Sequence, residues 1–266
     1  MEFLWTMLVG ALLLLAYFGW RHFEWTTLRR SVPPPWMPAE QASADQLFGC
    51  LLSANLAVLA DDDFKQLSSA LSASRSRRML AQQWKLNIAI ECRRKIESWL
   101  GSPGAAEAEE REAWAAWREG RQVDSDAYRA LSNGVAFLAD AGIVSAESVD
   151  ARHLSMVAWD VQQAAYVVRL GRAAGYLSRS MAESALARLQ HAARSHYMSW
   201  TDYSLSAILG MGVRGRFDLV EWHRVAQSHE LLLTTHAELL RRASFRRRLP
   251  EAGAMAPDAR RTARPE

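Results

Sequence analysis

Length, composition and charge exclude several classes of protein. The chain has 266 residues, of which 50% are hydrophobic and 23% charged, and this balance excludes a disordered, collagen-like or disulfide-scaffold chain. The net charge of +3 is unevenly placed, because eight arginines and three acids in residues 241–266 contribute +5 and leave residues 1–240 at −2. A nucleic-acid-binding domain carries clustered cations on its folded part, so we expect no nucleic-acid partner.

The amino terminus predicts a transmembrane helix. Residues 3–20 form an uncharged run of 18 residues, about 27 Å of helix against a hydrocarbon core of roughly 30 Å. Trp5, Tyr17 and Trp20 near its ends suit the two membrane interfaces. A cleaved signal peptide is the alternative, but the first two residues provide no cationic start and residues 21–24 offer no small-residue cleavage site. We therefore expect a retained anchor.

The cations around this run predict its orientation. Arg21, Arg29 and Arg30 follow the run and no cation precedes it. Because positively charged flanks stay in the cytoplasm, we expect a single-pass protein of the inner (cytoplasmic) membrane whose carboxy-terminal domain faces the cytoplasm.

Composition divides the chain into four parts. We expect an anchor and juxtamembrane helix over 1–30, a Pro-rich linker over 31–43, a helical domain over 44–248 and a disordered basic tail over 249–266. The linker carries the sequence PPPWMP, which favours a stiff polyproline-like spacer. The tail has little apolar surface to bury.

Apolar residues recur at three- and four-residue steps through the domain, and no stretch alternates with a period of two. The breaks include an acidic run at residues 61–63 and a Gly-Ser-Pro-Gly stop at 101–104. The expected fold is all-α, a single irregular multi-helix bundle with an N-terminal transmembrane helix. The expected helices are 44–60, 63–73, 76–100, 105–119, 125–140, 151–173, 180–197, 200–209 and 217–245.

The order of motifs in the second half resembles the bacterial family called domain of unknown function 1266. The motifs are Ala158-Trp159-Asp160, Gly175-Tyr176-Leu177, Glu183, Ser199-Trp200 and Leu209-Gly210. The resemblance covers about residues 78–215. The family commonly has an arginine after the Leu-Gly pair, where this chain has Met211. The resemblance implies one helical domain and no established activity.

A candidate polar cluster, functional or structural, follows from these motifs. Its members are Trp159, Asp160, Arg169, Arg172, Tyr176, Trp200 and Asp202. A buried acid in the middle of a helix is costly unless it is paired, so Asp160 indicates either a salt bridge between helices or a general acid or ligand contact. Ser199 and Asp202 have the spacing of a helix capping box, which favours a structural role for Asp202.

Other motifs favour structural roles. Residues 210–215 satisfy the GxGxxG pattern, but no strand pattern precedes them, so we interpret them as a turn between helices rather than a phosphate loop. The histidines show no metal-ligand spacing, and His229 and His236 are expected at the edge of the core. Cys50 and Cys92 are expected as reduced core thiols. We therefore expect no metal and no cofactor.

Arginines close the last predicted helix. Arg241, Arg242, Arg246, Arg247 and Arg248 either complete its carboxyl end or contact anionic lipids of the membrane. We therefore name anionic membrane lipids as an expected partner and these arginines as lipid-contact candidates.

These observations favour a non-catalytic, membrane-anchored helical module that binds an unidentified protein partner. Toxin immunity and an accessory role in an envelope machine are specific forms of this function. Eleven tryptophans suggest a tryptophan-rich binding surface, because interfaces are enriched in this residue. The alternative is an enzyme of unrecognised type with a site around Asp160, Arg169 and Arg172, to which Tyr176 or Asp202 would contribute.

Overall fold

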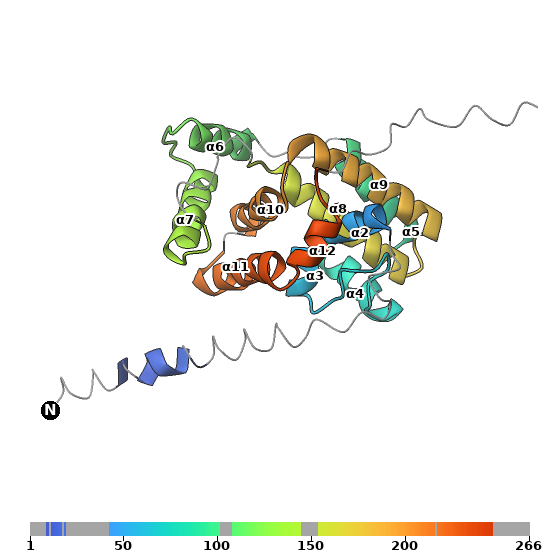
Figure 1. The fold of residues 1–266 in the computed structure, drawn as a ribbon, viewed down its shortest axis with the longest axis horizontal. Coiled ribbons are helices and arrows are strands. Elements are labelled where there is room, and N and C mark those ends of the chain that lie inside the picture. The colour runs from blue at the N-terminus through green and yellow to red at the C-terminus, as the bar shows by residue number, and fades with distance from the viewer. Residues whose placement is uncertain are drawn as a thin grey trace, which may run out of the picture.

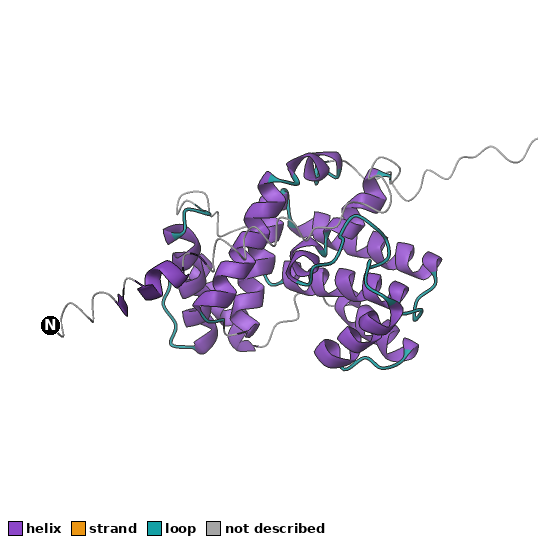
Figure 2. Ribbon diagram, turned by 90° about the horizontal axis from the view of Figure 1, so that it is seen from below, coloured by secondary structure: helices purple, strands orange, loops and turns teal. Residues whose placement is uncertain are grey.

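A computed structural model describes residues 9–10, 12–17, 19, 43–101, 108–144, 154–215 and 217–246. Within these ranges every regular element is a helix (Figures 1 and 2), which confirms the predicted all-α class. The elements are α2 (Ala44–Leu51), α3 (Ala54–Leu59), α4 (Ala73–Trp84), α5 (Ala89–Gly101), α6 (Ala108–Arg118), α7 (Asp126–Asp140), α8 (Val157–Ala173), α9 (Arg179–His196), α10 (Trp200–Gly215), α11 (Leu219–Thr234) and α12 (Ala237–Arg242).

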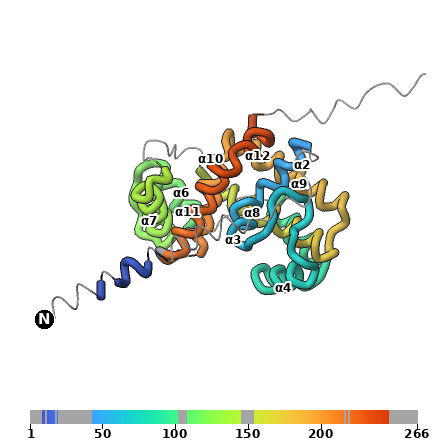
Figure 3. The backbone as a smooth tube through the Cα atoms, turned by 60° about the horizontal axis from the view of Figure 1, so that its bottom comes forward, coloured from blue at the N-terminus to red at the C-terminus, as the bar shows by residue number. Residues whose placement is uncertain are grey.

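Two hydrophobic cores lie side by side. The larger core is built from α2–α5, α8 and α9 with one end of α10, α11 and α12. The smaller core lies among α6, α7, the other end of α10 and the start of α11. Figure 3 shows α11 and α12 crossing from the side of α7 to the side of α2. The long helices α10 and α11 therefore join the two cores into one body.

Helix α8 lies at the centre of the larger core. It packs against α3, α4, α5, α9 and α10, and its side chains are buried on nearly every side. A helix enclosed in this way is apolar all round, which explains its many alanines and valines. Its buried polar residues are Asp160, Gln162 and Arg169, and each therefore requires partners inside the protein.

Three predicted helices are each broken in two. The helix predicted over 44–60 is interrupted at residues 52–53, and the one over 217–245 at residues 235–236. The helix predicted over 76–100 ends at Lys85, which adopts the left-handed conformation (φ 57°) and donates its backbone N–H to Leu80 O. Ile88 lies four residues after Trp84 and four before Cys92, a spacing that predicts burial on one helix face, yet it is 52% exposed. The periodicity was misleading because the chain turns between two helices that happen to keep similar spacing.

The GxGxxG motif lies inside α10, so its prediction as a turn was wrong. Gly210 and Gly212 are buried, and a Cβ at Gly210 would lie 2.7 Å from Trp159 Cβ. These glycines allow tryptophans to pack closely against the helix backbone. The motif is a packing surface between helices.

The tryptophans are also placed differently from the prediction. The seven described ones, Trp84, Trp99, Trp114, Trp117, Trp159, Trp200 and Trp222, are all buried or half-buried. They fill the two cores, so they form no exposed tryptophan-rich surface in the described part of the chain.

The described residues of the N-terminal segment are helical. Leu12, Leu13, Leu14 and Leu15 are 57–68% exposed, and the Tyr17 ring lies 6.3 Å from the His223 ring of α11. Among the described residues, no helix has both the length and the apolar character needed to cross a membrane. The predicted linker up to residue 42 and the predicted tail 249–266 lie outside the described residues.

Candidate functional site

The structure does not bring the predicted polar cluster together. Asp160 and Arg169 are nine residues apart on α8, about 13 Å along the helix axis, and Arg172 lies a further turn away. Each side chain therefore has its own surroundings, and a joint site of Asp160, Arg169 and Arg172 is not formed.

Asp160 faces α10. Its side chain is almost fully buried, and Oδ1 lies 3.8 Å from Nη1 of Arg214. The Arg214 guanidinium also donates to both carboxylate oxygens of Glu110, at 2.9 and 3.0 Å. Asp160 thus belongs to a charged contact that joins α6, α8 and α10, as the structural interpretation of this acid predicted.

The other members of the cluster stabilise separate junctions. The Tyr176 hydroxyl donates to Asn87 O at 2.5 Å, beside the loop between α4 and α5. Trp200 Nε1 donates to Ala243 O at 2.8 Å. Asp202 accepts from the Ser199 hydroxyl at 2.7 Å and donates its backbone N–H to the same oxygen at 3.1 Å. This confirms Ser199 and Asp202 as a local cap at the start of α10.

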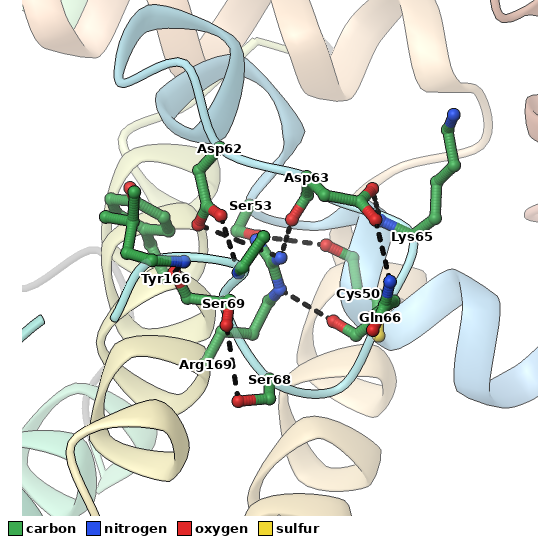
Figure 4. A network of polar contacts seen from close by, with 12 residues as sticks. Cys50, Ser53, Asp62, Asp63, Lys65, Gln66, Ser68, Ser69, Tyr166 and Arg169 are labelled. Carbon is green, nitrogen blue, oxygen red and sulfur yellow. Dashed lines mark hydrogen bonds and ion pairs between the residues drawn. The ribbon is translucent and has the colours of Figure 1, made fainter. Parts of the chain in front are cut away.

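Arg169 forms the most extensive polar network in the described part of the chain. Its side chain is 0% exposed, and the guanidinium points into the loop that follows α3 (Figure 4). Nε donates to Gln66 O at 2.9 Å and Nη1 to Ser53 Oγ at 3.0 Å. Nη2 donates to Asp63 O and lies 3.9 Å from Asp62 Oδ2. All three guanidinium nitrogens are thus directed at one loop and the turn before it.

The two aspartates hold the loop in shape around this guanidinium. Asp62 Oδ1 accepts from Ala70 N at 2.8 Å, and Asp63 Oδ1 accepts from Lys65 N at 2.9 Å. Aspartate side chains that accept from nearby backbone N–H groups stabilise turns at the expense of helix. The helix predicted over 63–73 is therefore absent, and residues 61–72 form a loop.

The chemistry of this network is that of a fixed structural contact. Burial raises the pKa of the adjacent Cys50 thiol to about 11, and burial raises the pKa of Tyr166 well above its usual value. Both groups are therefore protonated near neutral pH, and neither is an activated nucleophile or general base.

Arg169 was a candidate from the sequence, but its partners were not. The acidic run at residues 61–63 was interpreted only as a break between helices, whereas Asp62 and Asp63 are buried and contact Arg169. One signal was present: an arginine on a helix that is apolar on every side needs acceptors, and the acidic run after α3 provides carboxylates.

A second buried network contains a serine–histidine contact. Ser204 Oγ lies 2.8 Å from His229 Nδ1, and Asn55 Nδ2 donates to Ser204 Oγ and to Ser228 Oγ. Burial lowers the pKa of His229 to about 4, so the imidazole is neutral. The adjacent hollow has room for about one water molecule, which is too little for a substrate. The contact therefore connects α3, α10 and α11.

The other candidate groups have varied positions. Cys50 and Cys92 are buried and unpaired with each other, as predicted. His229 lies in the core and His236 packs its ring against Phe64 at 5.0 Å. Arg241 forms an exposed ion pair with Glu238 at 2.6 Å. Arg242 is the last residue of α12, Arg246 follows the helix, and Arg247 and Arg248 lie outside the described residues.

Comparisons with known proteins identify the family. A search among curated proteins and a search among solved structures found no match. One family model, described as protein of unknown function (DUF1266), matches residues 55–259. The match extends beyond residues 78–215 on both sides and includes the acidic loop, Arg169 and the serine–histidine network, whereas Ser53 lies just before it. The chain therefore belongs to the DUF1266 family.

Proposed function

We propose that this protein is a non-catalytic helical module, anchored in the inner membrane by its N-terminal segment, that binds a protein partner at the cytoplasmic face. The observation that carries the anchor is the exposure of Leu12–Leu15. Successive residues of a helix point about 100° apart, so four consecutive leucines cannot all pack on one face of the body. A hydrocarbon environment is the one that covers them all.

Charge supports the orientation. Arg21, Arg29 and Arg30 follow the apolar run, and such flanks stay on the cytoplasmic side. The helical body then lies in the cytoplasm, where its two buried thiols remain reduced.

The internal use of polar groups supports a binding role rather than a catalytic one. Arg169 is fully occupied by the loop after α3, Asp202 caps α10, and Asp160 contacts Arg214. An enzyme needs acids and bases whose functional atoms face a substrate. The candidate residues from the sequence are instead engaged inside the protein, in a loop contact, a helix cap and a contact between helices.

The anchor is tested by substitutions in its middle. Leu13→Arg together with Leu14→Arg places two charges at the centre of the apolar run, which strongly opposes insertion. We expect this variant to leave carbonate-washed membranes, whereas the matched Leu13→Ala and Leu14→Ala variant stays in them. An arginine variant that remains membrane-integrated would contradict the anchor.

The binding role is tested by affinity capture of the full chain from detergent-solubilised membranes. A protein companion at fixed stoichiometry is expected, and its identity distinguishes toxin immunity from an accessory role in an envelope machine. Recovery of the chain alone, with loss of its cellular phenotype in a correctly folded Asp160→Asn variant, would overturn the proposal in favour of chemistry.

A further inference from the structure

A second concentration of positive charge lies on and around α4 and α5, away from the arginines at the end of the chain. Residues 64–90 contain no acid, and residues 64–95 hold eight cations against Glu91 alone, a net charge of +7. This part of the chain is therefore basic, although residues 1–240 together are at −2. The sequence analysis overlooked it because the total charge hides it.

Five of these cations are exposed and not used by the fold. They are Arg75, Arg78, Lys85, Arg93 and Arg94, and we call them, with Ile88 and Ile90, the basic face. Among the described residues none of the five side chains forms a hydrogen bond or ion pair. Arg77 and Lys95 differ, because Arg77 Nε donates to Ala174 O and Lys95 lies 4.6 Å from the Trp99 ring centroid. The five cations are thus available to an external anion.

The nearby acids do not neutralise the basic face. Glu91 Oε2 accepts from the backbone N–H groups of Asn87 and Ile88, at 2.7 and 3.3 Å, and so caps the start of α5. Glu97 accepts two hydrogen bonds from Arg188 Nη1 of α9, at 2.7 and 2.9 Å. Both carboxylates are engaged, so the face remains strongly positive.

Two isoleucines project from the same corner. Ile88 and Ile90 are 52% and 45% exposed, and Ile90 shares a helix face with Arg93 and Arg94 at the i+3 and i+4 positions. The backbone that presents them is held by the Glu91 cap and by the Tyr176 hydroxyl on Asn87 O. Exposed aliphatic side chains surrounded by cations are the pattern of surfaces that lie in a membrane interface.

The placement of α4 suits such a contact. In Figure 1, α4 lies at the lower right of the body, and the described part of the N-terminal segment lies below α7 and α11 at the lower left. One flat membrane surface along this lower edge can therefore contact both α4 and the N-terminal segment. The 23 residues between Trp20 and Ala44 could extend to about 75 Å, so the tether alone leaves the orientation of the body undetermined.

We propose that the basic face docks on the anionic phospholipid headgroups of the same bilayer, with Ile88 and Ile90 inserted between them. The contact rests on the proposed membrane anchoring and adds to it a fixed orientation of the body. Each cation near an anionic leaflet strengthens binding by about fivefold. An RNA is less well matched, because no exposed side chain between these cations is aromatic and none provides a surface for base stacking.

The test measures insertion depth at one residue. The full chain carrying Ile90→Cys is labelled with bimane and reconstituted in nanodiscs of phosphatidylcholine, with or without phosphatidylglycerol, that contain doxyl-quencher lipids. Cys50 and Cys92 do not interfere, because both are buried and burial raises the pKa of each to about 11. We expect strong quenching in the anionic discs and weak quenching in the neutral ones. A Met198→Cys label should stay unquenched in both, because Met198 is also apolar and exposed but lies between α9 and α10.

Charge variants identify the surface. Arg93→Gln with Arg94→Gln should abolish quenching at position 90, and Arg241→Gln with Arg242→Gln, which removes the same charge from α12, should leave it unchanged. Absence of quenching in anionic discs, equal quenching in neutral discs, or dependence on Arg241 and Arg242 would overturn the proposal.

Failure of the anchor is seen separately, because the chain would then not co-purify with the discs. The basic face would in that case be tested by flotation of the free chain with phosphatidylglycerol vesicles, where loss of Arg93 and Arg94 should weaken binding about 25-fold.

Discussion

Trp222 of α11 inserts its ring between two glycines on different helices. A Cβ on Gly212 of α10 would lie 2.2 Å from the ring, and a Cβ on Gly134 of α7 would lie 2.3 Å from it. Real Cβ atoms do not approach side chains this closely, so only glycine fits on either side. The smaller core therefore depends on one aromatic ring that joins α7, α10 and α11.

Gly212→Ala should destabilise the protein by about 1–3 kcal/mol, the usual cost of overpacking a close-packed core. The added methyl group has no space, because the ring of Trp222 is held by Gly134 on its other side. Urea unfolding in detergent micelles, followed by near-ultraviolet circular dichroism, measures the loss. Gly101→Ala is the matched control, because nothing lies within 4 Å of the Cβ it adds. Equal stability of the two variants would contradict the packing described.

Arg169→Met should be more damaging, by about 3–5 kcal/mol, because it leaves the buried Asp62 carboxylate without its positively charged neighbour and two loop carbonyls without donors. Arg169→Lys should not restore the loss, since one ammonium cannot replace a guanidinium fork that reaches Gln66, Ser53 and Asp63. Limited proteolysis should then cut first within residues 61–72.

The control for this change is Arg188→Met, which removes an exposed ion pair with Glu97 and should cost less than about 1 kcal/mol. If Arg169→Met and Arg188→Met prove equally stable, the loop is not held by the guanidinium.

The sequence predicted the all-α class and the positions of most helices along the chain. It could do so because a helix that buries one face has apolar residues at three- and four-residue steps. The predicted ends near Gly142 and Gly175 were correct, and both glycines have positive φ, 68° and 80°. Periodicity could not locate the breaks at Ser53, Lys85 or Thr235. At Ser53 the break is tied to a contact from elsewhere in the fold, because the Ser53 hydroxyl accepts a hydrogen bond from Arg169 Nη1.

The candidate site was harder to predict for a related reason. Asp160 and Arg169 were grouped because they are near each other in sequence, yet a helix separates residues nine apart by more than two turns. Their true partners, Arg214 and Asp62, come from segments far away in the chain. A single sequence does not show which distant residues are in contact. A local cap is visible in it, because Ser199 and Asp202 are only three residues apart, and the role of Asp202 was therefore predicted correctly.

Both cysteines should resist alkylation in the folded protein. Burial raises the pKa of Cys50 and of Cys92 to about 11, so at pH 8 about one thiol in a thousand is ionised, and neither is accessible. We expect maleimide–polyethylene glycol to add nothing under native conditions and two groups in denaturant, as read by gel shift. Rapid native labelling of either thiol would show that the larger core opens locally.

Acid should destabilise the protein through His229. Burial lowers its pKa in the folded protein to about 4, against 6.5 as its ordinary value, so between these pH values the unfolded chain binds a proton that the folded one does not. The free energy of unfolding therefore falls as the pH drops from 6.5 to 4, by about 3 kcal/mol in total for this one residue.

His229→Asn, which can keep a hydrogen bond to Ser204, should remove that share of the pH dependence, as measured by urea unfolding at several pH values. His191→Asn, at an exposed position of α9, should leave the dependence as in the natural chain. If His229→Asn loses stability with acid as steeply as the natural protein, the imidazole of His229 is not the group that titrates. His236, whose pKa burial also lowers to about 4, is then the residue to vary next.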